Sequence, residues 1–464
     1  MANVNILPEE LLEKIAVRLY IPGKKTSDLA AFCAVSKKFN RIGSSILYKL
    51  FKLGLTPKVA HTRITLLLQT LVTNPDLAQL VHSLDLYVLE QRKRKIQEGI
   101  PEYKTFSRLL INDAFQSTAR LRYDLRRNFT YDMWADSVKQ GQDFAMAGLL
   151  LLRVPNLRHL SIRSTGFRPV FYWQPAVPQL HHLVSITSNI QLPWWLVTLP
   201  TLHSLEFDIQ NIANDSQFYR NYRLKCNPSG SERLHITILT FKFRYNIVLM
   251  NAFDVLELYC KRLLDYAPIL ENLHIYIQDH PSAPLRRRHR VRTALTVDLF
   301  YRTVRDLFGS NPLQSLRELI VFSAGQLTQD SNSNFLRLMN KIHLNPSLER
   351  LVLRQDSLVE FDGMTIDPPP ALRSLEIIDS TSEFDTWATN HLLRRIHGNR
   401  YPRLEQVVLW CDVLAEPRVL DPRHPRVLLQ DMLQSRGINL ILKLHGDTGW
   451  KTPNLFQFSN GSFV

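Results

Sequence analysis

The hexapeptide "LERLVL" (residues 348–353) carries apolar residues at its first, fourth and sixth positions. The last two of these, Leu351 and Leu353, lie two residues apart, so they face the same side of an extended strand. Val352 between them and Arg354 after them face the opposite side. The spacing therefore predicts a short strand that buries one face against neighbouring segments and leaves the other face for a different role.

The same spacing recurs along most of the chain. It is present in nine stretches, and a degenerate copy, "LHHLVSI", lies at residues 180–186. A proline often precedes a copy, as at Pro155, Pro268 and Pro402, where it ends the preceding helix or loop and favours extended backbone. The nine stretches begin at Val81, Leu157, Leu202, Ile236, Leu270, Leu316, Leu348, Leu372 and Leu404.

This spacing is the strand signature of a leucine-rich repeat. It predicts an α/β fold, a right-handed solenoid in which parallel strands line a concave face, with uneven helices and long loops on the convex side. The intervals between most copies run from about 22 to about 46 residues, against about 20–29 in regular repeats. The alternative is a globular α/β domain whose strands begin similarly, and the number of copies argues against it.

In such a solenoid, the side chains between and just after the two buried residues point into the concave face. They mix acids, bases and aromatic residues, and exposed aromatic residues are common anchors of protein interfaces. Phe322 and Trp410 are the anchors that we expect, unless insertions cover them and make them core residues. The residues expected to bind a target protein are Tyr87, Arg163, Asp208, Tyr276, Phe322, Arg354 and Trp410.

Two basic runs interrupt the repeats. "QRKRK" (91–95) lies in an insertion at residues 90–150, which continues into a helical stretch toward "AMAGLLLLRV". "RRRHRVR" (286–292) lies in a predicted basic loop at residues 281–293. A solvated loop is the default interpretation of such a run, and a nuclear-import signal or a patch for an acidic partner is the alternative.

The N-terminal stretch "LPEELLEKIAVRL" (7–19) predicts a helix of a different kind. Pro8 suits the first helical position, and the acids that follow it favour the positive end of a helix. Leu11, Leu12, Ile15, Ala16 and Leu19 form one apolar stripe, and Pro22-Gly23 ends the helix. A second helix, capped by Ser27 or Asp28, is predicted through Phe39, and a third from Ile42 to Phe51. Residues 58–75 predict a fourth helix, which Asn74-Pro75 ends.

The stretches "LPEELLEKIAVRL", "DLAAFCAVSKKFNRI" and "ILYKLF" together resemble an F-box, over about a tenth of the chain. The resemblance implies docking on the Skp-type adaptor of an SCF ubiquitin ligase, and through it on cullin and RING subunits. One departure is "IPGKKTS" (21–27), which lengthens the first connection; the alternative is a three-helix cap on the next domain. The adaptor-binding residues that it implies are Leu7, Pro8, Glu10, Leu11, Ile15, Leu19, Leu29, Val35, Phe39 and Leu47.

The expected layout has four parts. A terminal strand, "GINLILKL" (437–444), closes the repeats, and a polar segment without periodicity follows it. The whole resembles F-box proteins with divergent leucine-rich repeats, a type common in filamentous fungi. The parts are the F-box (1–54), a helical linker (55–80), the solenoid (81–445) and the polar tail (446–464).

Composition limits the other functions. The formal net charge of +15 favours acidic partners. The four cysteines lack metal-ligand or disulfide spacing, which favours a reducing compartment, the cytosol or the nucleus. The first residues do not resemble a signal peptide, and no apolar run is long enough to span a bilayer. No nucleotide-binding, hydrolase or metalloprotease motif is present, so we expect no catalytic residue, cofactor or metal.

The sequence therefore predicts a non-catalytic subunit that recognises the target of a ubiquitin ligase. A protein-interaction scaffold is the alternative, and a basic protein that associates with nucleic acid is less favoured.

Overall fold

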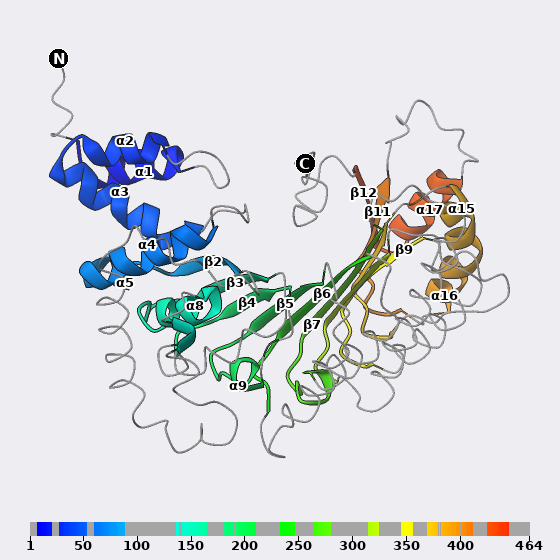
Figure 1. The fold of residues 1–464 in the computed structure, drawn as a ribbon. Helices are drawn as coiled ribbons and strands as arrows, with labels where there is room; N and C mark the ends of the chain where they lie inside the picture. Colours follow the sequence, from blue (N-terminus) through cyan, green and yellow to red (C-terminus); the bar gives the residue numbers. More distant parts are fainter. Residues whose placement is uncertain are drawn as a thin grey trace, which may run out of the picture. The chain divides into compact units, whose positions relative to one another are not determined.

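The computed structural model divides the chain into two compact units, Met1–Ile236 and Thr237–Val464, which are taken separately below (Figure 1). No helix in the described ranges is long and apolar enough to cross a bilayer. The structure describes residues 7–20, 27–52, 60–88, 136–138, 142–164, 180–189, 192, 194–209, 233–245, 263–279, 314–323, 345–355, 369–378, 380, 382–398, 401–411 and 425–444.

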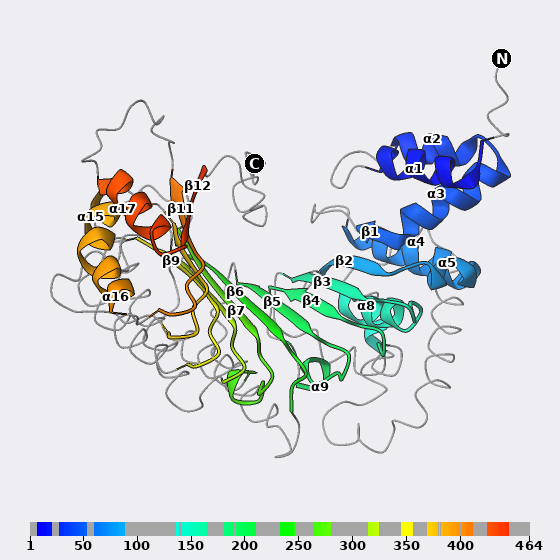
Figure 2. The same ribbon diagram turned by 180° about the vertical axis from the view of Figure 1, so that it is seen from behind.

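Unit 1 begins with three helices, α1 (Glu9–Leu19), α2 (Ser27–Ala34) and α3 (Lys37–Lys49), which lie against one another in Figure 2. The three-residue and four-residue spacing of their apolar side chains brings one stripe from each helix into a common core. That core consists of Leu12, Ala16, Leu29, Phe32, Phe39 and Ile42.

The second and third helices differ from the prediction. The second helix ends at Ala34 rather than continuing through Phe39, which belongs to α3. The hydroxyl of Ser36 accepts a hydrogen bond from the Phe39 backbone N–H at 3.3 Å, so a serine just before α3 favours a new helix start there. The third helix ends at Lys49, and the next residues form strand β1 (Leu50–Lys52), which pairs in parallel with β2 (Ser83–Val88).

The fourth predicted helix is confirmed as α4 (Ala60–Thr73). Asn74 ends it, and Pro75 then begins a further short helix, α5 (Pro75–Gln79), at the position where its missing N–H is tolerated. The helical stretch predicted before residue 152 is α8 (Asp143–Leu151), which contacts α4 and β2.

The remaining strands of unit 1 pair in parallel and in chain order: β2, β3 (His159–Ser164), β4 (Ser185–Ser188) and β5 (Ser204–Ile209), with the short helix α9 (Trp194–Val197) before β5. The degenerate copy is shifted by three residues from the predicted stretch 180–186. Leu183 takes the first apolar position, Ile186 pairs with Leu160 and Leu205, and Ser188 takes the last apolar position.

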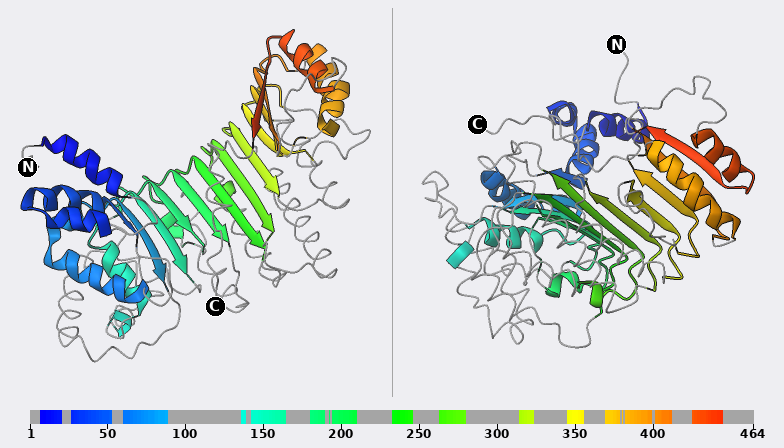
Figure 3. Two further views of the ribbon diagram at one scale, coloured as in Figure 1. Left: turned by 90° about the horizontal axis from the view of Figure 1, so that it is seen from above. Right: turned by 90° about the vertical axis from the view of Figure 1, so that its right-hand side faces the viewer.

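Unit 2 repeats the arrangement with seven strands that pair in parallel and in chain order (Figure 3). The last strand confirms the prediction for residues 437–444. The strands are β6 (Ile238–Tyr245), β7 (Asn272–Asp279), β8 (Glu318–Ser323), β9 (Arg350–Arg354), β10 (Ser374–Ile378), β11 (Gln406–Cys411) and β12 (Asn439–Leu444).

Helices lie between the last strands of unit 2. α15 (Ser382–Trp387), the π-helical segment η5 (Ala388–Leu392) and α16 (Leu393–His397) follow one another after β10. α17 (Pro425–Gln434) precedes β12, contacts it, and packs against all three. Together they bury Phe384, Leu392, Leu393, Leu429 and Leu433.

A backbone motif explains why each copy begins as it does. Leu270 closes a turn by donating its N–H to the carbonyl of Ala267 at 3.2 Å, and Pro268 occupies the second position of that turn, which proline favours. The next two N–H groups donate to the carbonyl of the preceding copy: Arg317 and Glu318 both donate to Glu271, at 2.8 and 2.9 Å. The proline thus shapes a turn before the strand, a more specific role than the predicted one.

These observations establish a repetitive, parallel α/β architecture within each unit. The basic runs at 91–95 and 286–292 and the tail 446–464 lie outside the described residues.

Candidate protein-binding surfaces

The first surface is on α1, where the predicted apolar stripe divides into two. Leu12 and Ala16 are fully buried in the core of the three helices, whereas Leu11 is 44% exposed and Ile15 is 40% exposed. Leu11 and Ile15 lie one helical turn apart and therefore share a side of α1. We call these two side chains the α1 surface.

The other residues of the F-box resemblance fall into three groups. Leu29 and Phe39 are core residues, so their side chains support the helices and do not reach a partner. Leu7, Leu19 and Leu47 are half-buried against the core. Pro8, Glu10 and Val35 are exposed, and Val35, in the connection between α2 and α3, is 63% exposed.

Polar contacts hold the start of α1 against α3. The ammonium group of Lys38 donates to the carbonyl of Leu7 at 2.9 Å, and the guanidinium of Arg41 pairs with the carboxylate of Glu9. These contacts join residues about 30 positions apart in the sequence. They fix the helix that carries the α1 surface.

The second surface is the sheet face opposite the buried leucines, which we call the alternate face. In unit 2 the predicted outward residues lie in register on neighbouring strands. One row is formed by Thr240, His274, Ile320, Val352, Glu376 and Val408. The prediction that these side chains share one face is confirmed for the strands of this unit.

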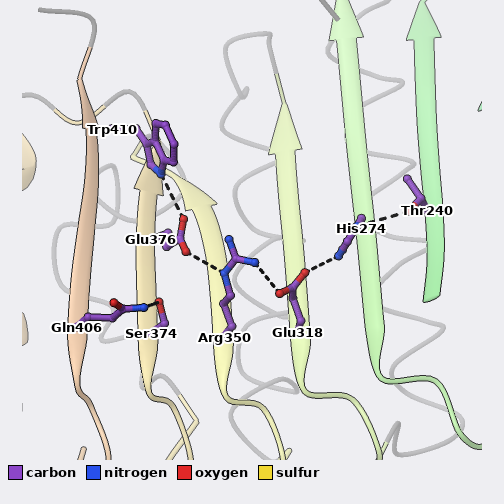
Figure 4. A network of polar contacts seen from close by, with 8 residues as sticks. All are labelled: Thr240, His274, Glu318, Arg350, Ser374, Glu376, Gln406 and Trp410. Atoms are coloured by element: carbon purple, nitrogen blue, oxygen red, sulfur yellow. Dashed lines mark hydrogen bonds and ion pairs between the residues drawn. The ribbon is translucent and has the colours of Figure 1, made fainter. Parts of the chain in front are cut away.

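A chain of polar contacts crosses the alternate face of unit 2 (Figure 4). Arg350 on β9 is its centre: Nη1 donates to Glu318 on β8 at 2.6 Å, and Nε donates to Glu376 on β10 at 2.8 Å. On one side, Nε2 of His274 lies 2.6 Å from Oε1 of Glu318, and Nδ1 lies 3.5 Å from the hydroxyl of Thr240. Five adjacent strands are therefore linked by side chains as well as by backbone.

The other side of this chain ends at a buried indole. Nε1 of Trp410 donates to Oε2 of Glu376 at 3.2 Å, and the Lys443 ammonium lies 4.8 Å from the centre of the Trp410 ring. Next to these residues, the amide of Gln406 donates to the hydroxyl of Ser374 at 2.9 Å.

Electrostatics hold the chain in its ionised form. Burial alone would raise the pKa of Glu318, but the contact with His274 and the charge and hydrogen bond of Arg350 outweigh it and lower the pKa to about 2. Burial works against the charge of Arg350, but the contacts with Glu376 and Glu318 raise its pKa. Both carboxylates therefore have their charge matched locally.

Apolar residues occupy the rest of the alternate face in unit 2. Tyr276 is 6% exposed and Trp410 is 4% exposed, and they cluster with Ile320, Val352, Ile378 and Val408. Phe322 is partly buried against the same cluster. Of the two predicted anchors, Trp410 is thus a core-like residue of this face, whereas Phe322 and Arg354 remain partly accessible.

On unit 1 the alternate face has a different charge pattern. Ser161 donates to Asp85 at 2.9 Å, and the Arg163 guanidinium lies 3.9 Å from the same carboxylate. The predicted residues Tyr87, Arg163 and Asp208 are all half-buried. Burial raises the pKa of Tyr87, and the charge of Arg163 opposes that rise.

The sequence analysis missed Glu318, Arg350, Ser374 and Gln406. Each occupies the third position of its copy, immediately before the second apolar residue. The alternation of a strand places this position on the same face as the fifth and seventh positions, which the analysis included. Extending the alternation by one step toward the N-terminus would have found all four.

Within the described ranges, no group of three or more His, Cys, Asp or Glu side chains is placed to hold a metal ion.

Comparison with known proteins gives little further information. No protein-family model matches the chain, and no curated protein matches its sequence. Among solved structures, the chain is similar to one in a structure described as "Crystal structure of Rad7 and Elc1 complex in yeast". The likeness has 14% identity and a TM-score of 0.27, and it covers 75% of this chain and 96% of that chain. At these values the likeness does not carry a function from one protein to the other.

Proposed function

We propose that this chain is a non-catalytic subunit of an SCF-type ubiquitin ligase, in which its N-terminal helices dock on a Skp-type adaptor and its repeats bind a target protein. The observation that carries the proposal is the α1 surface: Leu11 and Ile15 remain exposed on a helix whose neighbouring apolar residues are buried. The F-box resemblance of the sequence gives this surface its expected partner.

The energetics favour a protein partner for the α1 surface. Burying the exposed part of a leucine or isoleucine side chain stabilises a complex by about 1 kcal/mol. Val35 and Pro8 are also exposed and add to the apolar area that the three helices present. An adaptor that covers these side chains gains affinity without requiring the helices to rearrange.

The repeats supply the second half of the proposed mechanism. The alternate faces offer polar, aromatic and charged side chains in register, which suits recognition of another protein. The chain itself would perform no chemistry. By binding adaptor and target at once, it would raise the concentration of acceptor lysines near the conjugating enzyme, in the cytosol or the nucleus.

Co-purification with a Skp-type adaptor tests the proposal. We expect Leu11→Asp with Ile15→Asp to abolish adaptor recovery, because two carboxylates would have to be desolvated at the interface. Val17→Asp is the matched control: Val17 is 57% exposed on the same helix, but about 200° around it from Ile15. Adaptor recovery that survives the double substitution would contradict the proposal.

A scaffold without a role in ubiquitination is the alternative function. Both functions require adaptor or partner binding, so the discriminating measurement is ubiquitin transfer. Proteins that co-purify with the intact chain should acquire ubiquitin in a reconstituted reaction with adaptor, cullin, RING subunit and conjugating enzyme. Transfer that is equal with the wild type and with the Leu11→Asp, Ile15→Asp variant would favour the scaffold.

A further inference from the structure

The charges of the alternate face differ in sign between the two units. In unit 2 the described residues of this face include two acids, Glu318 and Glu376, against four bases, Lys242, Arg350, Arg354 and Lys443. In unit 1 the corresponding positions hold three acids, Asp85, Glu206 and Asp208, against one arginine, Arg163. Only the face of unit 2 therefore has a net positive charge.

The two acids of unit 2 do not cancel its attraction for an anion. Glu318 lies between His274 and Arg350, and Glu376 lies between Arg350 and the Trp410 indole. Their oxygens are occupied by donors within the face. The positive charge that this internal chain leaves over comes from Lys242, Arg354 and Lys443.

These three bases recur at a regular interval. Lys242 is on β6, Arg354 on β9 and Lys443 on β12, so each is three strands from the next. With about 4.8 Å between neighbouring strands, their backbones are spaced by about 14 Å. An extended peptide advances about 3.3 Å per residue, so every fourth side chain of a peptide lying across the strands would meet a base.

Aromatic and aliphatic residues fill the intervals. Tyr276 and Phe322 lie in register with Lys242, Ile378 lies beside Arg354, and Trp410 lies beside Lys443. A nucleic acid needs a continuous track of cations for its phosphates, and Arg350, the base nearest the centre, is already engaged by two carboxylates. The alternation of single bases with apolar side chains fits a peptide instead.

We propose that the alternate face of unit 2 binds an extended peptide segment of the target protein that carries acidic residues about four positions apart with apolar residues between them. The inference deepens the proposed function by giving the class of target. Unit 1, with its acidic face, would not bind this segment.

Fluorescence anisotropy with the full chain tests the inference. The probe is a labelled synthetic peptide of the sequence EGLSEGLSEGLSE, and the matched probe replaces each glutamate with glutamine. We expect the glutamate peptide to bind about tenfold more tightly, and its binding to weaken as sodium chloride rises. Equal binding of the two peptides, or stronger binding of a single-stranded oligonucleotide of similar length, would overturn the proposal.

Paired variants separate a site from the general positive charge of the chain. Arg354→Ala with Lys443→Ala should weaken binding of the glutamate peptide by about tenfold, and Arg354→Lys with Lys443→Arg should retain most of it. Arg158→Ala with Arg163→Ala removes the same charge from unit 1 and should change binding less than about twofold. Equal losses in the two alanine pairs would show diffuse attraction and refute a site.

The outcome is independent of adaptor docking. Failure of the peptide to bind, with adaptor recovery intact, would reject this inference and leave the proposed function standing. Loss of adaptor binding in the wild type would reject the proposed function, whatever the peptide does.

Discussion

Nη1 of Arg350 lies 2.6 Å from Oε2 of Glu318, across the boundary between two neighbouring repeats. The two residues are 32 positions apart in the sequence, and the parallel register of β8 and β9 places them opposite one another. Since Arg350 also holds Glu376 on the next strand, a single side chain ties three repeats together.

Replacing Arg350 should destabilise unit 2. Glu376 is 5% exposed and Glu318 is 20% exposed at the side chain, so Arg350→Ala would leave two poorly solvated carboxylates without their cation. We expect the free energy of unfolding in urea to fall by roughly 2 to 4 kcal/mol. Arg373→Ala is the control, because Arg373 and Glu405 are both more than half exposed; it should cost less than about 1 kcal/mol.

The low pKa of Glu318 predicts a dependence of stability on acidity. Because the folded pKa, about 2, is below the ordinary value of 4.5, the unfolded chain takes up a proton first as the pH falls. The contribution of Glu318 is therefore complete above about pH 5 and is lost between about pH 4.5 and pH 2; it amounts to about 3 kcal/mol at most.

Comparison with Glu318→Gln isolates this contribution from those of the other acids. The variant should be less stable than the wild type at pH 7, and the two unfolding free energies should converge as the pH falls below 4. A constant difference from pH 7 to pH 2.5 would contradict the assignment.

The repeat spacing of Leu351 and Leu353 was enough to predict the strand and its buried face, because burial of alternate residues needs no knowledge of the rest of the chain. The pairing of Glu318 with Arg350 needed the register between copies as well. Aligning the two copies on their leucines places both residues at the third position, so this register could have been read from the sequence.

Other features could not be predicted in this way. Leu11 and Leu12 are adjacent members of one apolar stripe, and their periodicity does not say which one the neighbouring helices cover. That division depends on how α2 and α3 pack, a property of three helices together. The break between Ala34 and Lys37 likewise depends on Ser36, whose preference for a helix start competed with an apolar pattern that runs on to Phe39.

Gly43 should tolerate no side chain. It is buried in α3, and a Cβ there would overlap Sγ of Cys33 and lie 3.1 Å from the Phe32 ring on α2. Alanine raises helix propensity by about 1 kcal/mol, but forcing α2 and α3 apart should cost about 1 to 3 kcal/mol more than that gain. Thermal unfolding followed by circular dichroism should therefore show a lower midpoint for Gly43→Ala.

A second substitution identifies the cause. Cys33→Ala removes the sulfur that the new methyl group would meet, so Cys33→Ala with Gly43→Ala should recover part of the midpoint lost by Gly43→Ala alone. If the double variant is no more stable than Gly43→Ala, the overlap with Cys33 does not explain the loss.

Asp385 and Arg426 should form the strongest coupled pair among the C-terminal helices. Asp385 on α15 is fully buried, and Oδ2 accepts a hydrogen bond at 3.0 Å from Nε of Arg426 on α17, which is 13% exposed at the side chain. Arg426→Ala strands a buried carboxylate and should cost about 3 to 5 kcal/mol, whereas Asp385→Ala with Arg426→Ala should cost less, because no buried charge remains. A double-mutant cycle measured by urea unfolding gives the coupling, and additive single and double losses would show that the two side chains act independently.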